Sequence, residues 1–185
     1  MLLSDIDILA LGPSVIDSFD PKKVQPASYD LALDSLLLIP YNRVSDVDLR
    51  ISKPADLTHS FNMAAHSTKA FTLEPGKCVL GSTQEVVTCP NDIAIRVEGK
   101  SSLARLFMLP HVAAGWIDPG FHGQITLEIV NLGPWNIVLY PGMPIAQMNF
   151  TRMSTPVGRP YGTYGLGSHY QGQMGPTSSV GERSK

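Results

Sequence analysis

Residues 70–97, AFTLEPGKCVLGSTQEVVTCPNDIAIRV, alternate short apolar runs with turn residues. The apolar runs lie at 70–73, 78–81, 85–88 and 93–97, and turn-forming residues fill 74–77 and 90–92. Runs rich in Val, Ile, Thr and Phe between Pro, Gly, Asn and Asp are typical of β-strands. Their spacing, within about 8–12 residues, predicts a compact all-β barrel or sandwich.

The flanking sequence continues this pattern in both directions. Further strands are predicted at 36–39, 136–140 and 145–150. Residues 42–60 are polar and predict a surface loop with little regular structure. Ser4, followed by Asp5 and Asp7, predicts a short N-capped helix over about residues 4–11 that ends at Gly12 and Pro13.

The C-terminal segment differs in composition from the rest. Residues 158–185 are rich in Gly, Ser, Tyr and Gln and poor in aliphatic side chains, so they cannot add to a core. Two alternatives follow: a disordered terminus, or a flexible arm whose aromatic and amide side chains become ordered over a ligand. We therefore expect a single β domain over residues 1–157 and a flexible arm over 158–185 that closes over the active site.

Composition excludes several classes of protein. A chain of 185 residues with 43% hydrophobic content is long enough for one well-buried domain. Its net charge of -2 and pI near 6.2 lack the basic balance of proteins that bind nucleic-acid polymers. No apolar run approaches the roughly 18 residues that cross a bilayer, so no membrane association is expected. Two cysteines without a C-x-x-C pair favour a cytoplasmic protein.

Residues 98–131, EGKSSLARLFMLPHVAAGWIDPGFHGQITLEIVN, hold the densest set of chemically active side chains, and we expect the active site here. Lys100 follows an apolar run and precedes Ser101, Ser102 and Arg105, which lie in a predicted short helix. Free N–H groups at a helix start, together with a cation, favour phosphate. Two alternatives stay open: the serines only cap the helix, and Arg105 is a structural ion-pair partner.

Glu128 lies in a predicted strand with strict alternation of polar and apolar residues. Gln124, Thr126 and Glu128 alternate with Ile125, Leu127 and Ile129, so the three polar residues share one face. If that face is in solvent, Glu128 is an ordinary surface carboxylate. If the face lines a pocket, burial would favour the neutral form and the side chain could exchange protons.

Metal chemistry has little support in the sequence. Zinc-dependent nucleobase deaminases carry an H-x-E element and a P-C-x-x-C element, and this chain has neither. His111 has no His or Cys partner at metal-ligand spacing. We expect no metal-ligating residues, and any hydrolytic deamination would run without zinc.

Several segments, taken together, resemble the dCTP deaminase family of the trimeric dUTPase-like superfamily. They are VQPASYDL at 24–31, GKSSLARL at 99–106, HVAAGWIDPGF at 111–121, Gly123, Leu127 with Glu128, PGM at 141–143, YQGQ at 170–173 and GPT at 175–177. The similarity covers nearly the whole chain in the family's order. The sequence at 115–118 and 121–123 looks most like the bifunctional deaminase and dUTPase branch, since deaminase-only members typically have His-Arg before Ile-Asp.

The resemblance implies a homotrimer of distorted β-barrels, of the jelly-roll, dUTPase-like type with a few short helices, and nucleotide sites between subunits. It also implies metal-independent hydrolysis of dCTP to dUTP in pyrimidine deoxynucleotide metabolism. Glu128 would deprotonate a water that attacks C4 of cytosine and would pass the proton to the departing ammonia. Ser101 and the Ala114 carbonyl would hold that water, and Arg105 would fix the carboxylate.

The same resemblance implies a set of substrate contacts. Asp118 would bind the 3′-hydroxyl of deoxyribose, while the triphosphate or base would contact Lys100, Ser102, Tyr170 and Gln173. The nucleotide would also contact Gly115, Trp116, Gln147, Tyr161 and His169. Magnesium would arrive with the triphosphate, and dTTP is a candidate feedback inhibitor.

Several functions stay open on sequence alone. The enzymatic alternatives are deamination to dUTP, continuation to dUMP and pyrophosphate with Asp118 positioning the second water, and dUTPase activity only. A non-catalytic nucleotide-binding regulatory trimer is the alternative from another class. Three positions depart from the family's usual residues: Ala113 replaces Thr, Phe107 replaces Gly and His169 replaces Lys. Because His is mostly neutral near pH 7, the change at His169 weakens the attraction for triphosphate.

Overall fold

The computed structural model describes residues 1–41, 46–48 and 57–180. In chain order the elements are α1 (Asp5–Val15), η1 (Pro21–Lys23), β1 (Val24–Gln25), β2 (Ser28–Ala32), β3 (Leu36–Pro40), β4 (Thr58–Asn62), η3 (Met63–Ala65), β5 (Phe71–Leu73), β6 (Cys78–Thr88), β7 (Ile93–Gly99), α2 (Ser101–Ala104), β8 (Met108–Leu109), β9 (Trp116–Ile117), β10 (His122–Asn131), β11 (Ile137–Leu139) and β12 (Pro144–Arg152). The predicted mainly β fold is confirmed.

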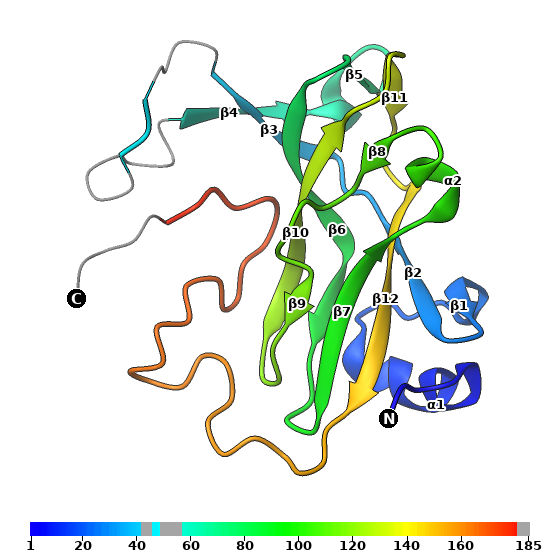
Figure 1. Cartoon of the computed structure of the whole chain (residues 1–185), viewed down its shortest axis with the longest axis vertical. Helices are drawn as coiled ribbons and strands as arrows, with labels where there is room; N and C mark the ends of the chain where they lie inside the picture. Colours follow the sequence, from blue (N-terminus) through cyan, green and yellow to red (C-terminus); the bar gives the residue numbers. More distant parts are fainter. Residues whose placement is uncertain (42–45, 49–56, 181–185) are drawn as a thin grey trace.

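Within these residues the strands form two five-stranded sheets and one two-stranded sheet (Figure 1). The first sheet has the order β1-β2-β12-β7-β9, the second has the order β4-β3-β6-β10-β8, and β11 pairs with β5. Buried side chains of both large sheets, such as Leu31, Phe150, Leu37 and Ile129, belong to one apolar cluster. The two sheets therefore enclose a common core, as a closed or nearly closed β-barrel does.

The N-terminal helix is longer than the sequence predicts. Ser4 caps it as expected, with Asp7 completing a capping box, but α1 continues through Gly12 and Pro13 to Val15. A proline inside a helix lacks the N–H for one backbone hydrogen bond and normally ends the helix. Tertiary packing prevails here, because Val15 and the C-cap residue Ile16 are 1% and 2% exposed. A Cβ at Gly12 would lie 2.2 Å from the Phe19 ring, so only glycine fits.

The loop predicted over residues 42–60 is wrong in its last part. Thr58 to Ser60 belong to β4, which pairs with β3 in antiparallel register. Residues 42–45 and 49–56 lie outside the described residues, so that part of the prediction is not tested.

Two predicted strands, at 78–81 and 85–88, are one continuous strand, β6. Its register with β10 shifts between Gln124 and Thr126, which marks a β-bulge. Thr83 bridges the shift, because its Oγ1 accepts from Ile125 N at 3.0 Å and donates to Glu85 O at 2.8 Å. Thr83 and Glu85 stay in the strand because the hydrogen bonds of their side chains are satisfied inside the barrel.

Glu85 connects the bulge to β2 and to η1. Its side chain is 4% exposed, and its Oε1 lies 2.6 Å from Lys23 Nζ. Its Oε2 accepts from Ala32 N at 3.0 Å. Burial alone would lower the pKa of Lys23, but the hydrogen bond and charge of Glu85 hold that pKa above 10.5. A raised Lys pKa stabilises the fold below about pH 10.4, and the contribution is lost as pH rises through the folded-state pKa.

Residues 153–180 leave the end of β12 and run along the β10 side of the barrel (Figure 1). Gly123 of β10 forms a parallel bridge with Gln173, and His122 O accepts from Gly172 N at 2.8 Å. The C-terminal segment is thus docked on its own chain. Among the described residues, no helix is both long and apolar enough to cross a membrane.

Replacing Glu85 with Ala leaves the Ala32 N–H buried without an acceptor and Lys23 without its counter-ion. We expect the free energy of unfolding, measured in urea at pH 7, to fall by about 1–3 kcal/mol. Glu74→Ala is the matched control, because Glu74 is an exposed turn carboxylate, and its effect should stay within about 0.5 kcal/mol. Equal losses in the two variants would contradict this role of Glu85.

Candidate functional site

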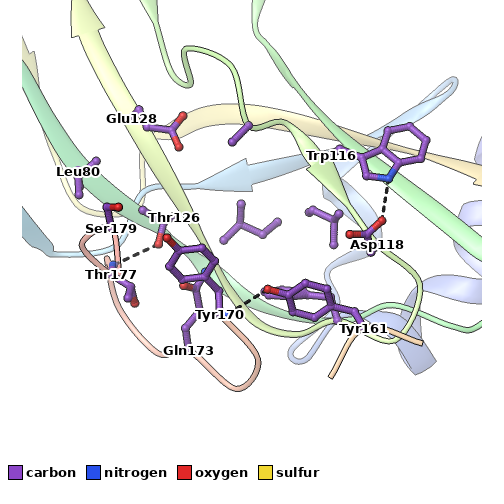
Figure 2. A pocket seen from close by; sticks show the side chains of 14 residues that line it. Leu80, Trp116, Asp118, Thr126, Glu128, Tyr161, Tyr170, Gln173, Thr177 and Ser179 are labelled. Atoms are coloured by element: carbon purple, nitrogen blue, oxygen red, sulfur yellow. Dashed lines mark hydrogen bonds between the residues drawn. The ribbon is translucent and has the colours of Figure 1, made fainter. Parts of the chain in front are cut away.

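A cavity of about 360 Å³ lies between β10, the 114–121 segment and the C-terminal arm (Figure 2). Seven residues predicted for the active site line it: Ala114, Trp116, Asp118, Glu128, Tyr161, Tyr170 and Gln173. The other lining residues are Leu80, Ile117, Phe121, Ile125, Thr126, Thr177 and Ser179. Segments far apart in sequence therefore meet at one cavity.

The polar face of β10 points into this cavity rather than into open solvent. Glu128 is half-buried and lines the cavity together with Thr126. Glu128 Oε2 accepts from Val112 N at 3.2 Å, and Thr126 Oγ1 accepts from Thr177 N at 3.2 Å. The polar face of β10 was predicted to lie either in solvent or along a pocket, and the structure shows that it lines a pocket. The Val112 bond uses one lone pair of Glu128 and leaves the carboxylate able to accept further donors.

The Asp118 turn lies at the opposite end of the cavity from Glu128 (Figure 2). Asp118 is exposed, and its Oδ1 accepts from Trp116 Nε1 at 3.1 Å. Phe121 N donates to Asp118 O at 3.1 Å, which closes the turn. Gly120 adopts a φ of 91°, and a Cβ there would lie 2.5 Å from Pro160 Cβ. Glycine at this position thus gives the turn its shape and admits the arm.

Aromatic and aliphatic side chains form the floor of the cavity. Ile117, Phe121 and Ile125 are 6%, 7% and 6% exposed. The Phe121 and Tyr161 rings lie 5.9 Å apart between centroids, and Tyr161 Oη accepts from Tyr170 N at 3.0 Å. An apolar floor with a few polar groups at its rim suits a flat heterocyclic ring.

Gln173 offers an unused hydrogen-bond acceptor. Its Nε2 donates to Gln124 O at 2.8 Å. Its Oε1 is buried and has no partner among residues 1–41, 46–48 and 57–180. Since buried polar atoms are normally paired, this unpaired oxygen is an exception among the buried side chains.

The predicted phosphate-binding residues of α2 do not line this cavity. Lys100 Nζ forms an ion pair with Asp30 Oδ1 of β2. Ser101 and Ser102 are exposed, and α2 has no side-chain cap, so the capping alternative for the serines is wrong. Arg105 is exposed and, in the part of the chain that the structure describes, makes no ion pair. The alternative that Arg105 is a structural ion-pair partner thus finds no such partner among the described residues of this chain.

The remaining predicted contacts also lie outside the cavity lining. Gln147 is held on β12, where Ser28 Oγ donates to its Oε1 at 2.9 Å and its Nε2 donates to Gly99 O at 3.0 Å. Gly115 is buried and does not line the cavity, although its neighbours Ala114 and Trp116 do. His169 is exposed, and its ring centroid lies 6.2 Å from that of Tyr170.

Phe107 has an unusual backbone conformation, whereas Ala113 is an ordinary exposed residue. Phe107 has a φ of 59°, in the left-handed region that favours glycine. A side chain at this position carries conformational strain of roughly 1–3 kcal/mol. Ala113 is exposed beside the cavity-lining Ala114.

Several lining residues were missed from the sequence. The alternation that selects Glu128 also selects Thr126, so Thr126 could have been found. Leu80 could not, because only the register of β6 against β10 pairs it with Glu128. Thr177 and Ser179 reach the cavity only because the arm docks on the barrel.

The described residues offer no cluster of three or more His, Cys, Asp or Glu side chains that could hold a metal ion. Cys78 is exposed and Cys89 is buried. Burial raises the pKa of the Cys89 thiol to about 12, which keeps it protonated and unreactive near neutral pH.

Gly115 sets the path of the segment that carries Ala114. Its carbonyl accepts from Val97 N at 2.7 Å, and a Cβ there would lie 2.7 Å from Val97 O and 2.8 Å from His111 Cε1. We expect Gly115→Ala to lower the free energy of unfolding by about 1–3 kcal/mol. A shift of this segment would also loosen the hydrogen bond from Val112 N to Glu128, so amide exchange at Val112 should be faster. The control is Gly158→Ala, where a Cβ meets nothing within 4 Å. Unchanged exchange and stability in Gly115→Ala would refute the constraint.

Comparisons with known proteins identify the family of this chain. Residues 2–153 match the dCTP deaminase-like family. The chain is 48% identical over 183 residues to the dUMP-forming dCTP deaminase of Acidothermus cellulolyticus, covering 97% of this chain and 94% of that protein. It is 46% identical over 185 residues to the enzyme of the same name from Mycobacterium ulcerans, covering 97% and 95%.

A solved structure shares the fold. The 2′-deoxycytidine 5′-triphosphate deaminase of Agrobacterium tumefaciens aligns with a TM-score of 0.64 at 24% identity. The alignment covers 80% of this chain and 46% of that one. The family match over residues 2–153 and the 48% identity to a curated relative lead to the same assignment. This chain belongs to the dCTP deaminase-like family.

Proposed function

We propose that this protein deaminates dCTP by hydrolysis and carries the product on to dUMP and pyrophosphate. Relatives at 46–49% identity are named dUMP-forming dCTP deaminases, and the chain spans at least 90% of each one's length. The observation that supports this most directly is the cavity that places Glu128 beside an apolar floor. Alternatives with dUTPase activity only, or with binding alone, leave Glu128 without a role.

Glu128 is the proposed general base and acid. As a carboxylate it would take a proton from a water whose oxygen attacks C4 of the cytosine ring. The resulting tetrahedral carbon expels ammonia once the exocyclic nitrogen receives the proton from Glu128. The proton of the new C4 hydroxyl ends on N3, and the ring becomes uracil. A side chain positioned in this way typically contributes about 10²–10⁴-fold to the rate. Ser101 and the Ala114 carbonyl are the proposed holders of the water, and Arg105 the proposed partner of the carboxylate.

Asp118 is the proposed reader of the sugar and the group that positions water for the second step. Its exposed carboxylate keeps Oδ1 on Trp116 Nε1 and leaves Oδ2 for a hydroxyl or a water. In that step a water oxygen bonds to the α-phosphorus of dUTP, and pyrophosphate leaves. Tyr161, Tyr170 and Gln173 would hold the nucleotide from the arm side of the cavity.

The triphosphate needs positive charge that this cavity lacks. Among the described residues that line it, the charged side chains are Asp118 and Glu128, both acidic. Lys100 and Arg105 lie with the serines around α2, away from the lining. We infer a homotrimer in which α2 of one copy faces the cavity of the next and supplies these groups.

Several further assignments are expectations of the same proposal. Magnesium would be held mainly by the phosphates and by water, as this ion prefers, rather than by a protein cage. Gly115, Trp116, Gln147 and His169 would contact the nucleotide at the edges of the completed site. The proposal also includes a cytoplasmic location and feedback inhibition by dTTP.

Incubation with dCTP and magnesium, followed by separation of the nucleotides, tests the reaction. We expect dUMP and pyrophosphate with little free dUTP, and a fall of at least about 10²-fold for Glu128→Gln. Glu74→Gln, at an exposed turn, should keep full activity. Accumulated dUTP would mean deamination alone, turnover of dUTP but not dCTP would mean dUTPase alone, and binding without turnover would favour the regulatory alternative. Full deamination by Glu128→Gln would eliminate the proposed acid–base role.

Mixing two inactive variants tests the shared site. Glu128→Gln and Arg105→Ala are denatured together in equal amounts and refolded. If the two residues act across a subunit boundary, random assembly of a trimer rebuilds about one quarter of the sites. Recovery of activity near that level is the expected result. No recovery in mixtures that form trimers would place both residues in the same chain's site.

A further inference from the structure

Gln124 occupies the point where the arm meets β10. It is 7% exposed and lies on the same strand face as Thr126 and Glu128. Its Nε2 donates to Asp34 Oδ2 at 2.9 Å, and its Oε1 accepts from Gly175 N of the arm. Both ends of the buried amide are therefore paired, one with the barrel and one with the arm.

Asp34 is a rigid anchor for this contact. Its backbone N–H donates to Ser82 O of β6 at 2.8 Å, and the preceding Leu33 forms a bridge with Thr83. The second oxygen of Asp34, Oδ1, accepts from Ser35 N. Asp34 thus fixes the direction of the Gln124 amide, and Gln124 in turn fixes the position of Gly175.

Backbone contacts around Gln124 extend the attachment. Gln124 N donates to Gln173 O at 3.0 Å, and Gln173 Nε2 donates back to Gln124 O at 2.8 Å. Gly123 has a φ of 146°, and a Cβ there would lie 2.7 Å from Gln173 O. The bare glycine lets the arm come close enough to form a parallel strand-like contact with β10.

The attachment point is close in sequence to the arm residues that line the cavity. Gln173, which is bonded to Gln124, carries the free Oε1, and Tyr170 lies three residues earlier. On the other side, Thr177 bonds to Thr126. Displacement of Gly175 would therefore move both halves of the arm away from the cavity that contains Glu128.

We propose that Gln124 is a positioning residue for the deamination reaction: by joining Asp34 to Gly175 it holds the arm in the register that places Tyr170 and Gln173 over the cavity. Gln124 touches no reacting atom and acts through the arm. The kinetic part of this inference rests on the proposed function, whereas the structural part, the Asp34–Gln124–Gly175 connection, does not.

The first test measures amide exchange of the arm without nucleotide. Gln124→Leu keeps similar bulk but leaves Asp34 and Gly175 unpaired, and we expect exchange at Gly172, Gly175 and Thr177 to accelerate about tenfold. Gln124→Glu keeps the acceptor for Gly175 N but removes the donor to Asp34 and places a second carboxylate beside that of Asp34. Asp34→Asn combined with Gln124→Glu reverses the donor and acceptor between the two side chains, and should restore slow exchange.

The second test compares kinetics with dCTP for the same variants. A loosened arm must be ordered when substrate binds, so KM should rise about tenfold while kcat does not fall. The double variant should recover a KM near that of the native chain. Thermal unfolding and exchange in peptides from β7 and β12 show whether the barrel is intact in each variant.

The outcomes separate this inference from the proposed reaction. Faster arm exchange in Gln124→Leu with an intact barrel, reversed in the double variant, supports the attachment even if dCTP is not turned over. Unchanged arm exchange in Gln124→Leu, or a double variant no better than Gln124→Glu, overturns it. Equal losses of kcat with no change in KM would overturn the positioning role and leave a structural one.

Discussion

The bulge in β6 opposite β10 is the constraint on which much of the structure depends. Thr83 bridges the interrupted ladder by accepting from Ile125 N, while Glu85 turns inward to bind Ala32 N and Lys23. Ser82 holds the backbone of Asp34. One irregular strand segment therefore fixes β2 and the Asp34 anchor, and it sets the register that places Glu128 opposite Leu80.

The consequences of this register reach the arm and the cavity. Gln124, Thr126 and Glu128 follow one another along a single face of β10, with different roles. Gln124 and Thr126 receive the arm through Gly175 and Thr177, and Glu128 is left to line the cavity with one oxygen on Val112 N. The arm then closes the cavity with side chains that the barrel does not supply.

The sequence predicted the parts of this arrangement that depend on local pattern. Alternation placed Glu128 on a polar face, and turn composition placed Asp118 between strands. It could not choose between solvent and pocket for that face, because the choice depends on an arm about fifty residues away in the chain. The path of α1 through Pro13, the ion pair of Lys100 with Asp30 and the attachment at Gln124 are tertiary effects without a local signal.

Among the described residues, the cavity of the single chain is lined by no Lys or Arg side chain. Its cavity has carboxylates and an apolar floor, while its basic residues near α2 lie elsewhere, which is the physical basis for proposing a shared site. A crystal structure of Glu128→Gln with dCTP and magnesium tests the account most directly. The account predicts the cytosine ring in the cavity, with C4 facing residue 128 and the triphosphate near Lys100 and Arg105 of another copy. A cytosine ring bound anywhere else would contradict it.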